Sequence, residues 1–231
     1  MRYSLVIPCF NEAKSLPELV EACQNANFPD NAEIILVDNG STDGSWLVLE
    51  RLCEYSKNIR LLRVKVNNGY GNGILTGLKA CEGEIVGWTH ADLQTNPADF
   101  LEAIKLYESK AGKKFIKGAR KKRPFNDQIF TIGMSFFESV LLKTWMWDIN
   151  AQPTVFDKQF FETWSNPPSD FSLDLFAYYQ AKKQKYNILR FGVYFGSRRY
   201  GRSHWNLNLK EKIKFIRRTV RYSIEMYRNT N

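Results

Sequence analysis

Residues 85–94 read Ile85-Val86-Gly87-Trp88-Thr89-His90-Ala91-Asp92-Leu93-Gln94, a short apolar run that ends in a polar cluster. Apolar runs of this length are typical of strands that a parallel sheet buries on both faces. The carboxylate, imidazole and amide groups that follow are the kinds of ligand that hold a divalent cation. Ligands of open α/β sheets bind beyond the carboxyl ends of the strands, so the sequence predicts a site here.

Three earlier apolar runs end in polar loops in the same way. Between the runs, apolar residues recur at helical spacing, which predicts strands that alternate with helices. A βαβαβ pattern forms a parallel sheet covered by helices, and its four polar loops then share one edge. The earlier runs and loops are residues 5–7 with Pro8-Cys9-Phe10-Asn11-Glu12, residues 34–37 with Asp38-Asn39-Gly40-Ser41-Thr42-Asp43, and residues 61–64 with Asn68-Gly69-Tyr70-Gly71-Asn72-Gly73.

Each of these loops has a chemical and a structural interpretation. Asp38 is placed to accept hydrogen bonds from a ribose or a base, whereas Ser41 and Asp43 are also residues that cap a helix. The glycine-rich loop that contains Gly69 and Gly71 either lets the backbone approach a diphosphate or is a flexible turn, because it lacks the spacing of the known phosphate-binding loops. Both interpretations remain open at this point.

Composition restricts the class of protein. A chain of 231 residues with 44% hydrophobic and 14% aromatic residues is long and apolar enough for one large folded domain. Its four cysteines lack metal-ligand spacing, and no apolar run approaches the roughly 20 residues of a membrane helix. We therefore expect a cytoplasmic protein with free thiols, either soluble or peripheral on the inner face of the membrane. The cysteines are Cys9, Cys23, Cys53 and Cys81.

The net charge of +9 is concentrated near the end of the chain. Residues 182–231 contain 14 Lys and Arg against 2 acidic residues, and a second basic cluster lies at residues 113–123. Apolar residues recur at steps of three and four over residues 209–228, which predicts an amphipathic helix. Such a helix either lies on anionic lipid or packs on the core. We accordingly divide the chain into residues 1–205 and a basic helical segment, 206–231.

Taken in order, PCFNE, DNGSTD, NNGYGNG, HADLQTNP and the later Gly118-Ala119-Arg120 resemble the motifs of family 2 glycosyltransferases. The similarity is greatest to the dolichol-phosphate mannosyltransferase-like branch and runs from residue 2 to about residue 205. It implies the GT-A fold, an α/β architecture with a mostly parallel central sheet and helices on both faces. It also implies an inverting transfer of a hexose from a UDP- or GDP-sugar to a polyprenyl-phosphate acceptor.

The resemblance assigns roles to individual residues. Asp92 and Gln94 match residues that bind Mn²⁺ or Mg²⁺ and the sugar diphosphate, and Arg120 matches a basic residue that meets phosphate. The segment around Gln152 resembles the stretch beneath the acceptor cleft. The implied nucleotide-sugar residues are Pro8, Asn11, Glu12, Asp38, Gly69, Gly71, His90 and Ala91. The implied acceptor residues are Ser135, Gln152, Arg198, Arg202 and Ser203.

One position departs from the family pattern. His90 stands where the family's DADLQ motif has its first acid, so the imidazole binds Mn²⁺, contacts the nucleotide directly, or does neither. A metal on Asp92 would act as a Lewis acid on the departing nucleotide. A hydroxyl acceptor would also need a general base, whereas a phosphate acceptor would not. Asp174 is our candidate base or acceptor-orienting acid and Asp170 the second, with helix capping the alternative for either.

Two other functions fit parts of the pattern. The first is transfer to a saccharide acceptor in the synthesis of a cell-envelope polysaccharide or glycolipid. The second is a non-catalytic module that binds a nucleotide sugar or nucleic acid, suggested by His90 and the basic tail. We expect no nucleic-acid partner, because Asp92 and Gln94 are present and no RNA-binding signature is evident.

Overall fold

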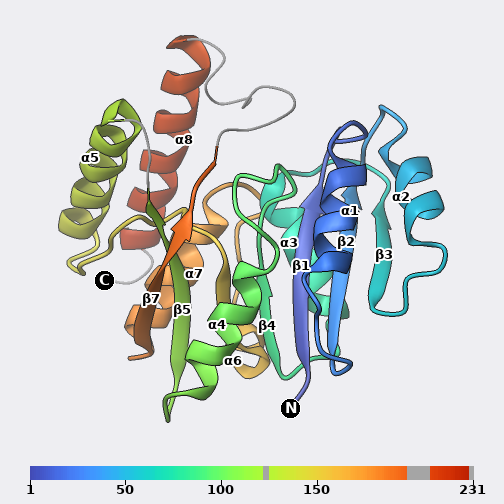
Figure 1. The fold of residues 1–231 in the computed structure, drawn as a ribbon. Coiled ribbons are helices and arrows are strands. Elements are labelled where there is room, and N and C mark those ends of the chain that lie inside the picture. Colours follow the sequence, from blue (N-terminus) through green and yellow to red (C-terminus); the bar gives the residue numbers. More distant parts are fainter. Residues whose placement is uncertain (122–124, 197–208, 229–231) are drawn as a thin grey trace.

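A seven-stranded sheet forms the centre of the fold, in the order β3-β2-β1-β4-β6-β5-β7 (Figure 1). The computed structural model describes residues 1–121, 125–196 and 209–228. Only β6 runs against its neighbours, since it pairs antiparallel with β4 and β5. The expected α/β architecture with a mostly parallel sheet is therefore confirmed. The strands are β1 Tyr3–Cys9, β2 Ala32–Asn39, β3 Ile59–Val64, β4 Ile85–Trp88, β5 Lys114–Lys121, β6 Thr154–Asp157 and β7 Asn187–Tyr194.

Helices cover both faces of the sheet because successive strand residues point to opposite sides and both sides are apolar. In β1, Val6 belongs to the cluster that includes α3 and α7, whereas Leu5 and Ile7 belong to the cluster that includes α1 and α4. The fold thus has three layers, as expected for this sheet type. The helices are α1 Leu16–Asn25, α2 Ser45–Cys53, α3 Tyr70–Ala80, α4 Asp99–Glu108, α5 Phe125–Leu141, α6 Lys158–Glu162, α7 Leu173–Lys183 and α8 Leu209–Arg228.

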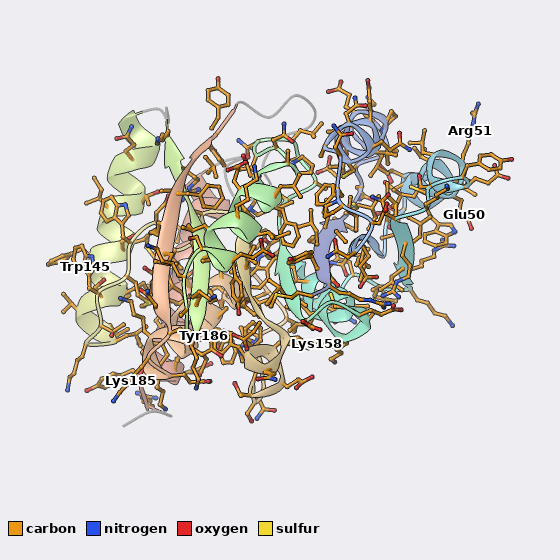
Figure 2. The ribbon with its side chains drawn as sticks, turned by 60° about the horizontal axis from the view of Figure 1, so that its bottom comes forward. Glu50, Arg51, Trp145, Lys158, Lys185 and Tyr186 are labelled. Atoms are coloured by element: carbon orange, nitrogen blue, oxygen red, sulfur yellow. The ribbon has the colours of Figure 1, made fainter. Side chains whose placement is uncertain are left out.

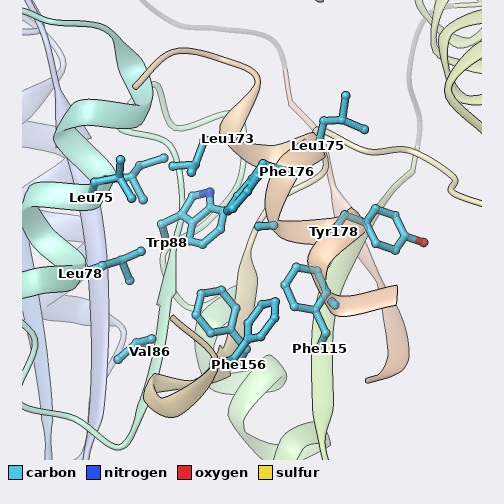
Figure 3. Packing of buried hydrophobic residues seen from close by; sticks show 14 of the residues in the cluster. Leu75, Leu78, Val86, Trp88, Phe115, Phe156, Leu173, Leu175, Phe176 and Tyr178 are labelled. Carbon is cyan, nitrogen blue, oxygen red and sulfur yellow. The ribbon is translucent and has the colours of Figure 1, made fainter. Parts of the chain in front are cut away.

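Aromatic side chains fill the core on the α7 side of the sheet (Figure 3). Phe115 of β5 stacks on Phe156 of β6 at 5.6 Å between ring centroids, and Trp88 of β4 meets Phe156 edge-on at 5.6 Å. Such ring pairs add to the stabilisation from buried apolar area. The packing fixes the last residue of β4, which the polar cluster at residues 89–94 follows directly.

The basic helix α8 packs on the rest of the domain beside α5 (Figure 1). Ser223 and Met226 are buried, and the Ser223 hydroxyl donates to the Glu138 carboxyl at 2.8 Å. Only part of the predicted apolar stripe faces the domain, because Tyr227 packs against the core whereas Ile213 and Ile224 are exposed. The most buried residues of α8, Ser223 and Met226, lie beside that stripe.

The Glu138 carboxyl makes stability depend on pH. Burial raises its pKa from 4.5 to about 7, so between these values the folded protein binds more protons than the unfolded chain. We expect the free energy of unfolding to fall by roughly 3 kcal/mol as the pH rises through this window, at about 1.4 kcal/mol per pKa unit. Denaturant titrations from about pH 4 to about pH 8 measure this slope.

Glu138→Gln removes the titrating group and should flatten that pH dependence. Glu50→Gln, at an exposed position of α2, is the matched control and should leave the slope as in the wild type. An unchanged slope in Glu138→Gln would contradict the assignment.

Candidate functional site

The loops after β1 and β2 are locked together by side chains at the carboxyl edge of the sheet. The Asn11 N–H donates to the Ser41 hydroxyl at 2.9 Å, and the Thr42 N–H donates to the Asn11 side-chain oxygen at 2.8 Å. The Glu12 N–H donates to the Ser45 hydroxyl at 3.0 Å. Asn11 has a φ of +54°, a conformation that asparagine tolerates better than most residues. Asn11 and Glu12, which the sequence assigned to nucleotide binding, thus also fix the conformation of the loop that contains them.

Asp38 and Asp43 differ in their contacts, which bears on the choice between ligand binding and helix capping that the sequence left open. Asp43 accepts hydrogen bonds from the N–H groups of Ala13 and Ser45. Burial alone would raise the pKa of Asp43, but these bonds and one from the Ser45 hydroxyl lower it below its usual value. Asp43 is therefore structural, as the capping interpretation proposed.

Asp38 is fully buried at the end of β2, and one of its oxygens is uncommitted to hydrogen bonds. Its Oδ1 accepts from the Ser41 N–H at 3.1 Å, whereas Oδ2 has no hydrogen-bond partner among the described residues. The Nε of Arg63, a largely exposed residue, lies 3.7 Å from Oδ2, and its guanidinium lies 5.1 Å from the centre of the Trp46 ring. Buried carboxylate oxygens are normally hydrogen-bonded to protein or water, so Oδ2 retains the capacity to accept a further donor.

The loop after β4 turns sharply at Leu93, which has a φ of +57°. The Gln94 N–H donates to the Asp92 carboxylate at 3.1 Å, and the Gln94 side-chain N–H donates to the Gly196 carbonyl at 3.1 Å. A reciprocal bond of 2.8 Å runs from the Gly196 N–H to the Gln94 carbonyl. This loop is thereby tied to the segment that follows β7, a link that the local motif could not show.

The glycines at the start of α3 allow another segment of the protein to approach closely. A Cβ at Gly69, where φ is +108°, would lie 2.4 Å from the Ser169 carbonyl oxygen. A Cβ at Gly71 would lie 2.7 Å from the carbonyl oxygens of Pro168 and Asp170. The close approach of residues 168–170 therefore explains both glycines, so a diphosphate is not needed to account for them.

Tyr70 connects this loop to the residue that departs from the family pattern. Its hydroxyl lies 3.4 Å from His90 Nδ1 and 3.4 Å from the Gln152 side-chain nitrogen, which donates to Asp174 at 2.7 Å. The Tyr70 ring stacks on Phe171 with 4.6 Å between centroids. Predicted donor-side and acceptor-side residues, His90, Gln152 and Asp174, thus lie in one continuous network.

Lys117 is the member of this network that sequence reasoning missed. It is fully buried on β5, donates to the Thr154 hydroxyl at 2.9 Å and lies 3.8 Å from Asp174 Oδ1. Burial lowers the pKa of Lys117 to about 8 and raises that of Asp174, and each charge offsets part of the other's shift. A signal was present in the sequence, since Lys117 directly follows the apolar pair Phe115-Ile116, and these residues form part of β5.

Two further candidates, Arg120 and Ser135, are engaged around Asp148. The Arg120 guanidinium binds the Asp148 carboxylate, with 2.8 Å from Nε to Oδ1, and the Asp148 N–H donates to the Ser135 hydroxyl at 3.2 Å. Burial by itself would raise the pKa of Asp148. The Arg120 guanidinium more than offsets this effect, so the pKa lies below its usual value. Ser135 is 2% exposed, and its hydroxyl supports the turn at Asp148. The predicted acceptor residues Arg198, Arg202 and Ser203 lie outside the described residues.

Asp170 is likewise committed. Its Oδ1 accepts from the Ser172 N–H at 2.9 Å just before α7, and its Oδ2 lies 3.1 Å from Nε of Arg218 on α8. These contacts agree with the alternative role of Asp170, which is to cap the start of α7. Asp174, in the first turn of α7, instead points into the buried network.

The mixed sheet with polar loops at its carboxyl edge is that of the GT-A fold class, and comparison with known proteins gives the family. The family model of glycosyl transferase family 2 matches residues 4–166. The chain belongs to this family. A solved structure of glucosyl-3-phosphoglycerate synthase from Mycobacterium tuberculosis, in complex with Mn²⁺, UDP-glucose and phosphoglyceric acid, has a TM-score of 0.78. It is 14% identical, and the match covers 98% of this chain and 79% of that one.

Curated relatives match a shorter part of the chain. An undecaprenyl-phosphate 4-deoxy-4-formamido-L-arabinose transferase of Pseudomonas syringae pv. syringae (strain B728a) is 38% identical over 109 residues, which are 46% of this chain and 32% of the relative. A dolichol-phosphate mannosyltransferase of Pyrococcus furiosus is 31% identical over 140 residues, which are 58% of this chain and 39% of the relative. The matched stretch is therefore well under half of each relative. Among the described residues, we find no helix with the length and apolar character that crossing a membrane requires.

The buried pair of Lys117 and Asp174 gives a stability prediction. Lys117→Met leaves Asp174 buried without its cation and should lower the free energy of unfolding by about 3 to 5 kcal/mol. In that background Asp174→Asn removes the stranded charge and should restore part of the loss. Urea titrations of the two single variants and the double variant measure the coupling between the side chains. Additive effects would show that the two charges do not interact.

Proposed function

We propose that this chain carries the catalytic site of an inverting glycosyltransferase that moves a hexose from a nucleotide-diphosphate sugar to a polyprenyl phosphate. The observation that carries the proposal is that Asp38 and Asp92 lie at the same sheet edge of a family 2 domain, after β2 and β4, the two strands that flank β1. The relatives from Pseudomonas syringae and Pyrococcus furiosus are both named as transferases of a polyprenyl phosphate, undecaprenyl phosphate and dolichol phosphate respectively. The saccharide acceptor remains the second candidate, and the non-catalytic module has no support from these matches.

The residues of the loop after β4 suit a divalent metal ion that would be held jointly by the protein and by the diphosphate of the nucleotide sugar. No group of three or more His, Cys, Asp and Glu side chains that could hold a metal occurs among the described residues. Asp92, with His90 beside it, would therefore share the ion with diphosphate oxygens, a coordination typical of Mg²⁺ and open to Mn²⁺. When bound, the ion would stabilise the charge that develops on the departing nucleotide. Gln94, held by Gly196, would position the loop.

The environment of Asp174 favours the phosphate acceptor over a sugar hydroxyl. Asp174 is 2% exposed, accepts from Gln152 and lies beside the Lys117 ammonium. A general base must reach the proton that it removes, and this carboxylate is occupied by partners within the protein. A phosphate acceptor is already an anion and needs no base. A lipid acceptor would also bring the protein to a membrane surface.

Donor binding tests the first half of the proposal. We expect calorimetry to show binding of UDP or GDP that depends on Mn²⁺ or Mg²⁺, because the diphosphate and Asp92 complete the coordination together. Asp92→Ala should abolish the metal-dependent part and lower transfer to undecaprenyl phosphate by about 10²- to 10³-fold, as loss of one charge-stabilising group does. Asp30→Ala, at an exposed turn before β2, is the control. Equal binding by wild type and Asp92→Ala would reject the site.

The acceptor class is tested at Asp174. If the acceptor is a phosphate, Asp174→Asn should reduce the turnover of folded protein by less than about tenfold, because no proton has to be removed. If the acceptor is a sugar hydroxyl and Asp174 is its base, the loss should reach about 10²- to 10⁴-fold. Transfer to undecaprenyl phosphate is measured per mole of folded protein, as judged by circular dichroism. A loss in the second range would move the saccharide acceptor ahead.

A further inference from the structure

Among its described residues, helix α5 buries polar side chains and exposes large apolar ones. Its buried side carries Ser135, Glu138 and Ser139, together with Leu142 just beyond the helix. Its exposed side chains include four large apolar ones, and two exposed tryptophans follow in the next turn. We name this set the α5 apolar surface: Ile132, Phe136, Phe137, Val140, Trp145 and Trp147.

Hydrogen bonds hold α5 in this orientation. The Ser139 hydroxyl accepts from the Met146 N–H at 2.9 Å, Glu138 accepts from Ser223 of α8, and Ser135 accepts from the Asp148 N–H. If the helix rolled to bury its phenylalanines, these buried polar groups would lose their partners, which is costly. The apolar side chains are therefore held outward by the packing of the polar ones.

The α5 apolar surface is large and nearly uncharged. Six of the fourteen large hydrophobic side chains that are exposed in the described residues lie within residues 132–147. In residues 128–147 the charged side chains are Glu138, which is buried, and Lys143. Phe136, Val140 and Trp145 are each more than 60% exposed. Figure 2 shows Trp145 projecting outward at the side of the molecule opposite Glu50 and Arg51 of α2. Contiguous apolar surfaces of this kind mark interaction sites.

The neighbouring helix indicates the kind of partner. Exposed Arg217, Arg221 and Arg228 of α8 recur along one side of that helix with exposed Ile213 and Ile224. Residues 209–228 contain seven basic and two acidic residues. Tryptophan and phenylalanine beside arginine are the combination that binds the headgroup region of an anionic bilayer. A purely apolar protein partner would leave these charges without a complement.

We infer that the α5 apolar surface, together with the basic side of α8, docks this domain on an anionic lipid bilayer. The inference rests on the proposed function insofar as a lipid acceptor gives the docking its purpose. It differs from the alternative that the apolar stripe of α8 itself lies on lipid, because α8 packs its Tyr222, Ser223 and Met226 side on the domain and α5 supplies the apolar contact.

The test is co-sedimentation with vesicles of phosphatidylcholine, alone or mixed with phosphatidylglycerol. We expect the wild type to bind the mixed vesicles more strongly. The double variant Phe136→Ser with Val140→Ser should bind them at least tenfold more weakly, which is about 1.4 kcal/mol. The matched control is Leu47→Ser with Tyr55→Ser, which removes two exposed apolar side chains from the α2 side and should bind as the wild type does. Arg217→Gln with Arg221→Gln should weaken binding to the mixed vesicles only.

Three outcomes would overturn the inference. One is equal binding by the wild type and the α5 variant, and another is equal binding of the wild type to neutral and mixed vesicles. The third is a wild-type dimer in light scattering that the α5 variant converts to a monomer without any change in vesicle binding, which would assign the surface to a second copy.

Nucleotide calorimetry separates this inference from the proposed function. The α5 variant should bind UDP or GDP with metal as the wild type does, because its two substitutions lie outside the donor loops. A wild type that binds vesicles but no nucleotide would reject the proposed function and keep the docking surface. A wild type that binds nucleotide but no vesicles would reject the surface alone.

Discussion

The hydrogen bond from Gln152 to Asp174, with Lys117 3.8 Å from the same carboxylate oxygen, is the interaction on which the site depends. It joins the segment before β6, the first turn of α7 and the middle of β5, three elements that are distant in sequence. Taking such charges out of water is costly, and only mutual attraction and additional hydrogen bonds offset the cost. The arrangement therefore restricts how these elements can pack, and it places Tyr70 and His90 above them.

The positions of His90 and Tyr70 follow from that restriction. Tyr70 meets Gln152 below and His90 beside it, and its ring is covered by Phe171 from the segment that leads into α7. The glycines on either side of Tyr70 allow the same segment to approach closely. The loop before Tyr70 and the segment that leads into α7 are consequently packed together. Tyr70 links His90 of the β4 loop to Gln152, which is bonded to the buried Asp174 carboxylate.

Sequence reasoning could predict what local patterns determine. Short continuous apolar runs predicted the four parallel strands, and the rule that ligands bind at their carboxyl ends placed Asp38 and Asp92 at one edge. Long-range contacts were beyond its reach, because nothing in the Gly69 loop shows that residues 168–170 will pack on it. The same holds for Arg120, whose partner Asp148 is 28 residues away. Nor does the sequence show that the Ser135 hydroxyl is buried against the turn at Asp148.

Helix α5 shows why hydrophobic periodicity alone can assign the wrong face. A surface helix normally turns its apolar stripe to the core, so the stripe is taken as the buried side. That rule assumes that water covers the other side, and it fails wherever the second solvent is a lipid bilayer. In α5 the polar residues are paired in the interior, and Phe136 and Phe137 face outward, where the inferred docking surface would use them. The aliphatic stripe of α8 was compatible with lipid from sequence, but among the described residues α5 exposes more large apolar side chains than α8 does.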